Sequence, residues 1–140
     1  MLQTEPSLDN NNIVNYIGLK HDYSNINCIT LIQAYYKNEL GIDLCLPKYD
    51  ESRAWLKQFT VTFLDNWANQ YGKKVLLTEV KNYEIMAFRS KKTELLTHFA
   101  MFIMPYKMLH VEEGRSSTVE LLSDKWLDNL HGIYRHNALV

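Results

Sequence analysis

Residues 27–41 read NCITLIQAYYKNELG and place a cysteine at the first position of an apolar helical run. Asn27 is a good helix N-cap and Gly41 is a typical stop, so we expect a helix from Cys28 to about Glu39. The free amino end of a helix carries partial positive charge and unpaired N–H groups. A thiol placed there is easier to ionise, and the thiolate is the nucleophilic form of cysteine.

Two histidines lie far downstream, on two expected strands that are joined by a turn at Pro105-Tyr106. Strand alternation predicts one face carrying His98, Ala100 and Phe102 and another carrying Phe99, Met101 and Ile103. The turn can bring His110 beside His98. A histidine can deprotonate a cysteine near neutral pH, and a second polar group can orient its ring. Cys28, His98 and His110 are therefore the candidate catalytic residues.

Each candidate also has a plain structural explanation. Cys28 could be a buried structural cysteine, which is the role that we assign to Cys45. His98 could be satisfied within the sheet, and His110 could be an exposed strand end. A zinc site built from Cys28, His98 and His110 ranks third, because the sequence lacks a close ligand pair. We expect neither a metal nor another cofactor, and we expect His131 and His136 at the surface.

Periodicity predicts the remaining elements. Helices are expected over residues 11–19, 51–71 and 125–130. The first has an apolar side formed by Ile13, Val14 and Ile17. The second has an aromatic residue at every fourth position: Trp55, Phe59, Phe63 and Trp67. Strands are expected over residues 74–80, 83–88, 97–104, 108–111, 118–121 and 132–136. Helices followed by an antiparallel sheet indicate an α+β domain.

Composition restricts the class of protein. With 140 residues, 46% of them hydrophobic, the chain can form one globular domain over 1–140, and we expect 1–12 to be flexible or loosely docked. A net charge of −1 gives no bulk attraction to nucleic acid. Two cysteines are too few for a disulfide framework. The amino-terminal residues lack the features of a secretory signal, and the longest apolar stretch is too short for stable membrane insertion.

Residues 16–31 resemble the nucleophile motif of NlpC-like cell-wall cysteine peptidases, especially the tail-tip peptidases of long-tailed bacteriophages known as tail protein K. That motif runs Ile-Gly-x-Pro-Tyr-x-x-Gly-Gly-x-Asp-Cys-x-Gly-Leu and is followed by a helix ending in Glu-Leu-Gly-Ile, as at residues 39–42 here. Residues 97–102 resemble the family's histidine strand. Residues 108–115 resemble the phage form of the next strand, including its Glu-Gly-Arg turn.

The resemblance implies a papain-like NlpC-type domain, with the nucleophile helix packed on an antiparallel β-sheet. It also implies Cys28 as nucleophile, His98 as general base and acid, and His110 as orienting residue, acting on stem peptides of peptidoglycan. His21 stands where the family keeps a tyrosine that lines the reaction site, and Tyr23 could serve instead, so both are candidate substrate-binding residues. Asn27 replaces the family's Asp.

These features lead to one main hypothesis and two alternatives. The main one is a phage tail-associated cysteine peptidase that cuts peptidoglycan during cell-wall penetration. It would be made in the host cytoplasm without a signal peptide and carried in the virion beside other tail-tip proteins. The first alternative is a structural or assembly component of the tail tip that keeps the peptidase fold, suggested by the altered loop over residues 20–26. The second is a cytosolic thiol acyltransferase or amidase.

Overall fold

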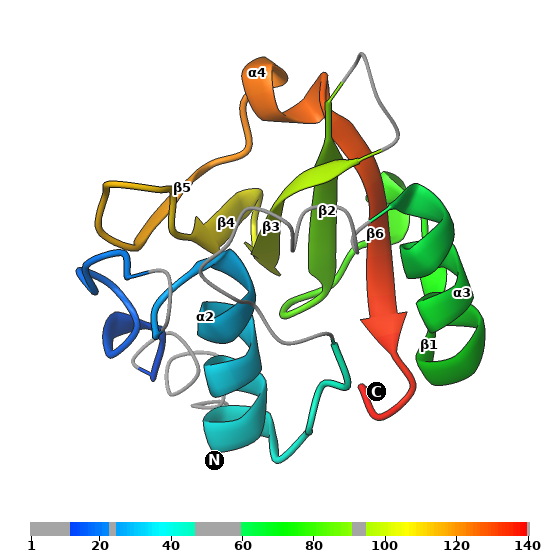
Figure 1. Cartoon of the computed structure of the whole chain (residues 1–140), viewed down its shortest axis with the longest axis horizontal. Helices are drawn as coiled ribbons and strands as arrows, with labels where there is room; N and C mark the ends of the chain where they lie inside the picture. Colours follow the sequence, from blue (N-terminus) through cyan, green and yellow to red (C-terminus); the bar gives the residue numbers. More distant parts are fainter. Residues whose placement is uncertain (1–11, 23–24, 47–59, 91–94, 140) are drawn as a thin grey trace.

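The computed structural model describes residues 12–22, 25–46, 60–90 and 95–139. Its strands form one antiparallel six-stranded sheet in the order β1-β6-β2-β3-β4-β5 (Figure 1). The strands are β1 (Gly72–Val75), β2 (Ile85–Arg89), β3 (Leu96–Ile103), β4 (Lys107–His110), β5 (Thr118–Leu121) and β6 (Leu130–His136). The helices are α2 (Cys28–Tyr35), continued by the π-helix η1 (Tyr36–Leu40), then α3 (Val61–Tyr71), the 3-10 helix η3 (Leu77–Glu79) and α4 (Asp124–Leu127).

The cysteine helix, made up of α2 and η1, begins and ends within about one residue of the predicted bounds. The side chain of Asn27 accepts hydrogen bonds from the N–H groups of Ile29 and Thr30, and Thr30 Oγ1 accepts from the Asn27 N–H in return. This reciprocal pair is a capping box. At the other end, Gly41 has a φ of 68°, a left-handed conformation that favours glycine. The last turn widens into a π-helix, which the sequence pattern did not predict.

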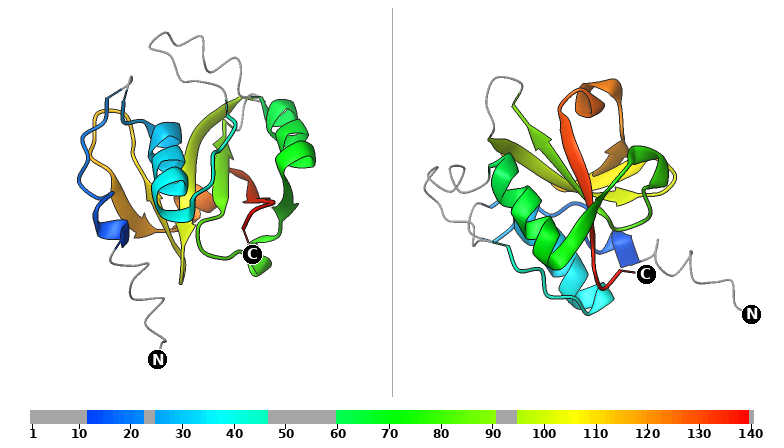
Figure 2. Two further views of the ribbon diagram at one scale, coloured as in Figure 1. Left: turned by 90° about the horizontal axis from the view of Figure 1, so that it is seen from below. Right: turned by 90° about the vertical axis from the view of Figure 1, so that its right-hand side faces the viewer.

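The two faces of β3 point into different cores, as strand alternation predicts. Phe99, Met101 and Ile103 pack in the core beneath α2 and α3, together with Cys28. Ala100 and Phe102 pack in a second core on the opposite face, which α4 covers with Trp126. Figure 2 shows α2 and α3 on one side of the sheet. The cysteine helix therefore lies directly on the strand that carries His98.

The expected helix over residues 51–71 is wrong in its extent. Thr60 is extended, with φ −88° and ψ 161°, and its side chain accepts a hydrogen bond from the Phe63 N–H, so α3 begins at Val61. The expected aromatic residues Trp55 and Phe59 lie outside the described residues. The chain then enters β1 directly at Gly72, two residues before the predicted strand. A Cβ at Gly72 would lie 2.2 Å from the Arg135 carbonyl oxygen, so this close approach needs glycine.

The other predicted boundaries lie within about two residues of the observed ones, except in three places. The carboxyl-terminal half of the expected strand over 74–80 is the 3-10 helix η3. Helix α4 ends at Leu127 rather than at residue 130. Near the amino end, the helical residues among those described are 12–14, and the chain from residue 15 to 19 is not helical. Ile13 is buried, whereas Val14 and Ile17 are exposed. No helix within the described ranges is long and apolar enough to cross a membrane.

Candidate active site

Cys28 occupies the first turn of α2, where the helix meets β3. Its side chain is buried, with 8% of its surface exposed, and it is a free thiol. The sulfur is within hydrogen-bonding reach of the backbone N–H groups of Phe99, Cys28 and Ile29. Phe99 directly follows His98, so the sulfur lies against the main chain of the expected base. Cys45, by contrast, is exposed in the loop after the helix, so it is not a buried structural cysteine.

The environment of the Cys28 thiol opposes ionisation more than the sequence suggests. Burial raises the pKa of Cys28 to about 11, although the N–H groups of Phe99, Cys28 and Ile29 lower it. A partly charged helix end was expected to dominate, but the cost of removing a thiolate from water is larger here. The resting thiol is therefore neutral near pH 7.

His98 and His110 lie side by side, as the predicted hairpin requires. His98 Nε2 is 2.8 Å from His110 Nδ1, and the two rings meet edge to face at 5.0 Å. His110 is 1% exposed and so is not an exposed strand end. Its Nε2 lies 2.5 Å from Glu120 Oε1 on β5. Trp126 stacks on His98 at 5.2 Å and donates its Nε1–H to Glu120 Oε2 at 3.3 Å.

The imidazole of His98 is neutral in this setting. Burial among aromatic rings, and to a smaller extent the neighbouring His110, lower the pKa of His98 to about 3. Since Nε2 of His98 faces His110, Nδ1 is the nitrogen left for a reacting group.

A polar hollow opens beside His110. It is lined by His110, Glu112, Arg115, Ser116, Thr118 and Glu120. Potential ligand atoms of His110, Glu112 and Glu120 lie within 4.8 Å of one another, and they are the only such donor group among the described residues. The zinc site considered from Cys28, His98 and His110 is therefore not formed in that part of the chain.

The two candidate substrate-binding residues have different outcomes. Tyr23 lies outside the described residues. His21 is half-buried, and its backbone N–H donates to the Arg115 carbonyl at 2.9 Å. The Gly18 N–H donates to the Ser117 carbonyl, and the Ser117 N–H donates to the Leu19 carbonyl. The segment over residues 18–21 therefore runs along the connection between β4 and β5. His21 is thus held beside the segment that lines the polar hollow, and its role stays a prediction.

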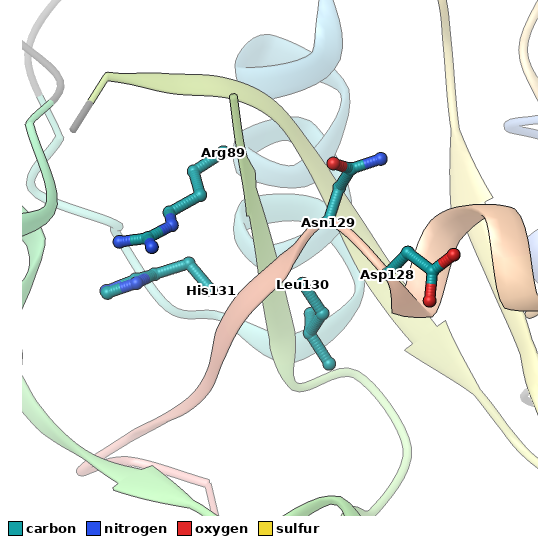
Figure 3. A pocket seen from close by; sticks show the side chains of 5 residues that line it. All are labelled: Arg89, Asp128, Asn129, Leu130 and His131. Atoms are coloured by element: carbon teal, nitrogen blue, oxygen red, sulfur yellow. The ribbon is translucent and has the colours of Figure 1, made fainter. Parts of the chain in front are cut away.

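A second polar pocket lies one strand away from His98. It is lined by Arg89, Asp128, Asn129, Leu130 and His131, and Figure 3 shows the side chains of Arg89 and His131 extending toward the same side. Arg89 ends β2, the strand that pairs with β3. The expectation that His131 lies at the surface is wrong, because its side chain is 11% exposed and packs against Asp65. His136, also expected at the surface, is half-buried.

Glu120 and Trp126 were not singled out from the sequence. Glu120 is opposite Met108 in the pairing of β5 with β4, and its carboxylate reaches His110 only because of that register. A glutamate ten residues after a histidine carries no signal of its own. Trp126 reaches the histidines from α4 across the second core.

The fold matches solved structures of NlpC/P60 proteins. A lipoprotein-like NLP/P60 family protein of Staphylococcus aureus aligns with 96% of this chain and 42% of its own, at 19% identity and a TM-score of 0.61. An NlpC/P60 family protein of Bacillus cereus aligns with 96% of this chain and 40% of its own, at 15% identity and a TM-score of 0.62. The NlpC/p60 domain of the peptidoglycan hydrolase SagA aligns with 93% of this chain and 97% of its own, at 15% identity and a TM-score of 0.60.

These matches establish the architecture. This chain has the papain-like α+β fold of NlpC/P60 domains, with the cysteine helix on an antiparallel sheet, as the sequence predicted. It spans about two fifths of the length of the first two proteins. No family model and no curated protein sequence matches the chain.

Proposed function

We propose that this chain is a cysteine peptidase that hydrolyses the stem peptides of peptidoglycan. Cys28 would be the nucleophile, His98 the base and acid, and His110 the orienting residue. The observation that carries the proposal is the convergence of three features: a cysteine at a capped helix start, the main chain of a histidine against its sulfur, and a second histidine 2.8 Å from the first. The likeness to the SagA domain, which belongs to a peptidoglycan hydrolase, supports the substrate class.

The geometry suggests how the reaction would proceed. His98 Nδ1 takes the thiol proton while the Cys28 sulfur attacks the carbonyl carbon of the scissile peptide bond. Because both groups are neutral at rest, this proton transfer accompanies the attack instead of preceding it. The N–H groups of Cys28 and Phe99, which already face the sulfur, would stabilise the resulting oxyanion.

Breakdown of this tetrahedral species needs the same histidine. His98 returns the proton to the departing amine as the C–N bond breaks, leaving a thioester on Cys28. Water, losing a proton to His98, then attacks the thioester carbon. The peptide leaves as a carboxylic acid, and the sulfur recovers its proton. The cycle consumes one water and needs no cofactor.

We further propose that the protein acts in a phage tail. Support comes from the sequence alone: the Glu-Leu-Gly-Ile ending at residues 39–42 and the Glu-Gly-Arg turn at residues 113–115 resemble the phage tail-tip form. The protein would be made in the host cytoplasm and assembled with other tail-tip proteins. Mass spectrometry of purified virions should then detect peptides of this chain, and their absence from infectious particles would contradict a tail location.

A structural role in the tail tip is the second candidate. It is favoured by the buried Cys28 thiol, by its raised pKa, and by the lack of a hydrogen bond between the sulfur and His98 in the described part of the chain. A resting geometry that is too long for such a bond does not exclude catalysis, since these contacts often tighten when substrate binds. The two functions therefore need an activity measurement.

Digestion of purified peptidoglycan separates them. The wild type should release soluble stem-peptide fragments that mass spectrometry can identify, and Cys28→Ala should release none. Cys45→Ala is the matched control, because it removes the other free thiol and should retain full release. A wild type that is folded but releases nothing from sacculi of several wall chemistries would favour the structural role.

A further inference from the structure

Glu120 is the last member of a chain of hydrogen bonds that begins at His98. Its Oε1 lies 2.5 Å from His110 Nε2, and its Oε2 accepts the Nε1–H of Trp126 at 3.3 Å. The His110 ring is 1% exposed, whereas the Glu120 side chain is 39% exposed. The carboxylate therefore connects the buried His110, and through it the half-buried His98, to the rim of the polar hollow.

The chemistry of the carboxylate dictates where the protons lie. An ionised carboxylate only accepts hydrogen bonds, so His110 Nε2 must carry a hydrogen. In a neutral imidazole the other nitrogen is then an acceptor, and it faces His98 Nε2 at 2.8 Å. His98 Nε2 must therefore donate. This leaves the lone pair of His98 on Nδ1, the nitrogen needed to accept the Cys28 proton.

The opposite arrangement would disable the base. If His110 carried its hydrogen on Nδ1, or on both nitrogens, then His98 Nε2 would have to accept. A neutral His98 would in that case carry its hydrogen on Nδ1 and could not take a proton from the thiol. A neutral histidine pair has no intrinsic reason to choose the productive arrangement, so an external acceptor has to select it.

Trp126 holds the selecting group in place. Its indole stacks on His98 with ring planes 30° apart and meets His110 edge-on at 5.1 Å. The same indole donates to the oxygen of Glu120 that His110 does not use. With both oxygens occupied by fixed donors, the carboxylate has one orientation. The indole also helps to bury His110, and a less polar setting strengthens its hydrogen bonds.

We propose that Glu120 is a positioning residue that fixes the tautomers of His110 and His98, so that His98 Nδ1 faces the reaction as a free base. The assignment of roles rests on the proposed function, in which Cys28 is the nucleophile. Glu120 touches neither the sulfur nor the substrate in this account. It acts through His110, whose Nε2 it contacts.

The tautomers can be read without any substrate. In long-range proton–nitrogen NMR spectra of the histidine-labelled protein at pH 7, both His98 and His110 should carry hydrogen on Nε2 only. Glu120→Ala should change the His110 pattern to a mixture or to the Nδ1–H form. Glu112→Gln is the matched control, because it removes a neighbouring charge from the same hollow and should leave the pattern unchanged. A wild-type His110 protonated on Nδ1 would overturn the proposal.

Kinetics provide the second readout. Glu120→Ala should lower kcat for a synthetic stem peptide by about tenfold or more with little change in KM, since a misplaced histidine proton removes general-base assistance. Glu120→Gln should lose less, because its amide oxygen can still accept from His110. Equal losses in Glu120→Ala and Glu112→Gln would overturn the proposal. If the wild type cuts no peptide, the proposed function fails, whereas the NMR result still decides the role of Glu120.

Discussion

Replacing Asn27 by alanine tests how the nucleophile is positioned. Asn27 is 1% exposed, and its Oδ1 accepts from the N–H groups of Ile29 at 3.1 Å and Thr30 at 3.0 Å. An N-cap loss costs about 0.5–2 kcal/mol. One buried and one partly buried N–H group lose their partner here, so we expect a loss of about 2 kcal/mol in the free energy of unfolding. A domain with ordinary stability of roughly 5–15 kcal/mol would remain folded.

Thr60 provides a matched control in another helix. Its half-buried side chain accepts the Phe63 N–H at 3.0 Å, so Thr60→Ala should cost about 1 kcal/mol. Asn27→Asp keeps the acceptor and should stay within about 0.5 kcal/mol of the wild type. Urea unfolding followed by tryptophan fluorescence would measure all three differences.

The same variants test whether the cap acts on the thiol. With Cys45→Ser as background, iodoacetamide labelling of Cys28 should change in Asn27→Ala and stay unchanged in Thr60→Ala, although both are destabilised. The reasoning would be refuted by an Asn27→Ala variant as stable as the wild type. It would equally be refuted if both alanine variants changed the labelling rate alike, because general loosening would then explain the effect.

Three further predictions concern the histidine pair and its surroundings. Burial, and then His110, lower the pKa of His98 in the folded protein to about 3, whereas the unfolded value is about 6.5. The neutral His98 therefore contributes fully to the free energy of unfolding above about pH 6.5. This contribution is lost as pH falls toward 3, by up to about 5 kcal/mol. Urea unfolding of the wild type and His98→Gln at several pH values checks this, and parallel curves would contradict it. Because burial raises the pKa of Cys28 to about 11, the rate of iodoacetamide labelling should keep rising beyond pH 9. Near neutral pH the rate should be constant, and His98→Gln should abolish this plateau. A rate that levels off near pH 8.5 would argue against a buried thiol. Trp126→Phe keeps a ring on His98 but loses the donor to Glu120, so unfolding should become easier by about 1 kcal/mol, and an unchanged urea midpoint would show that this bond contributes nothing.

The sequence is most informative where local rules and burial agree. Asn27 and Gly41 define the cysteine helix through capping chemistry, which depends only on neighbouring residues. Alternation sorts residues 97–103 onto two faces because each face of β3 packs into a separate core. The hairpin then brings His98 and His110 together, since a short turn joins consecutive antiparallel strands. The core of the candidate site could therefore be predicted.

The remaining features depend on long-range packing. Thr60 is extended and caps α3, which apolar spacing across residues 51–71 does not reveal. His131 is largely buried because β6 lies between β1 and β2 in the sheet and passes Asp65. Glu120 reaches His110 through the register of the edge strand. The pKa of the Cys28 thiol also depends on long-range packing, because burial raises it more than the helix end lowers it.

Hydrolysis of a synthetic stem peptide containing D-γ-glutamate and a diamino acid would show whether Cys28 is the nucleophile of a peptidase. Turnover by the wild type, Cys28→Ala and Cys45→Ala would be measured by mass spectrometry of the products at neutral pH. We expect cleavage by the wild type and Cys45→Ala at equal rates and none by Cys28→Ala. Cleavage that persists in Cys28→Ala, or an intact peptide after long incubation with the folded wild type, would contradict it.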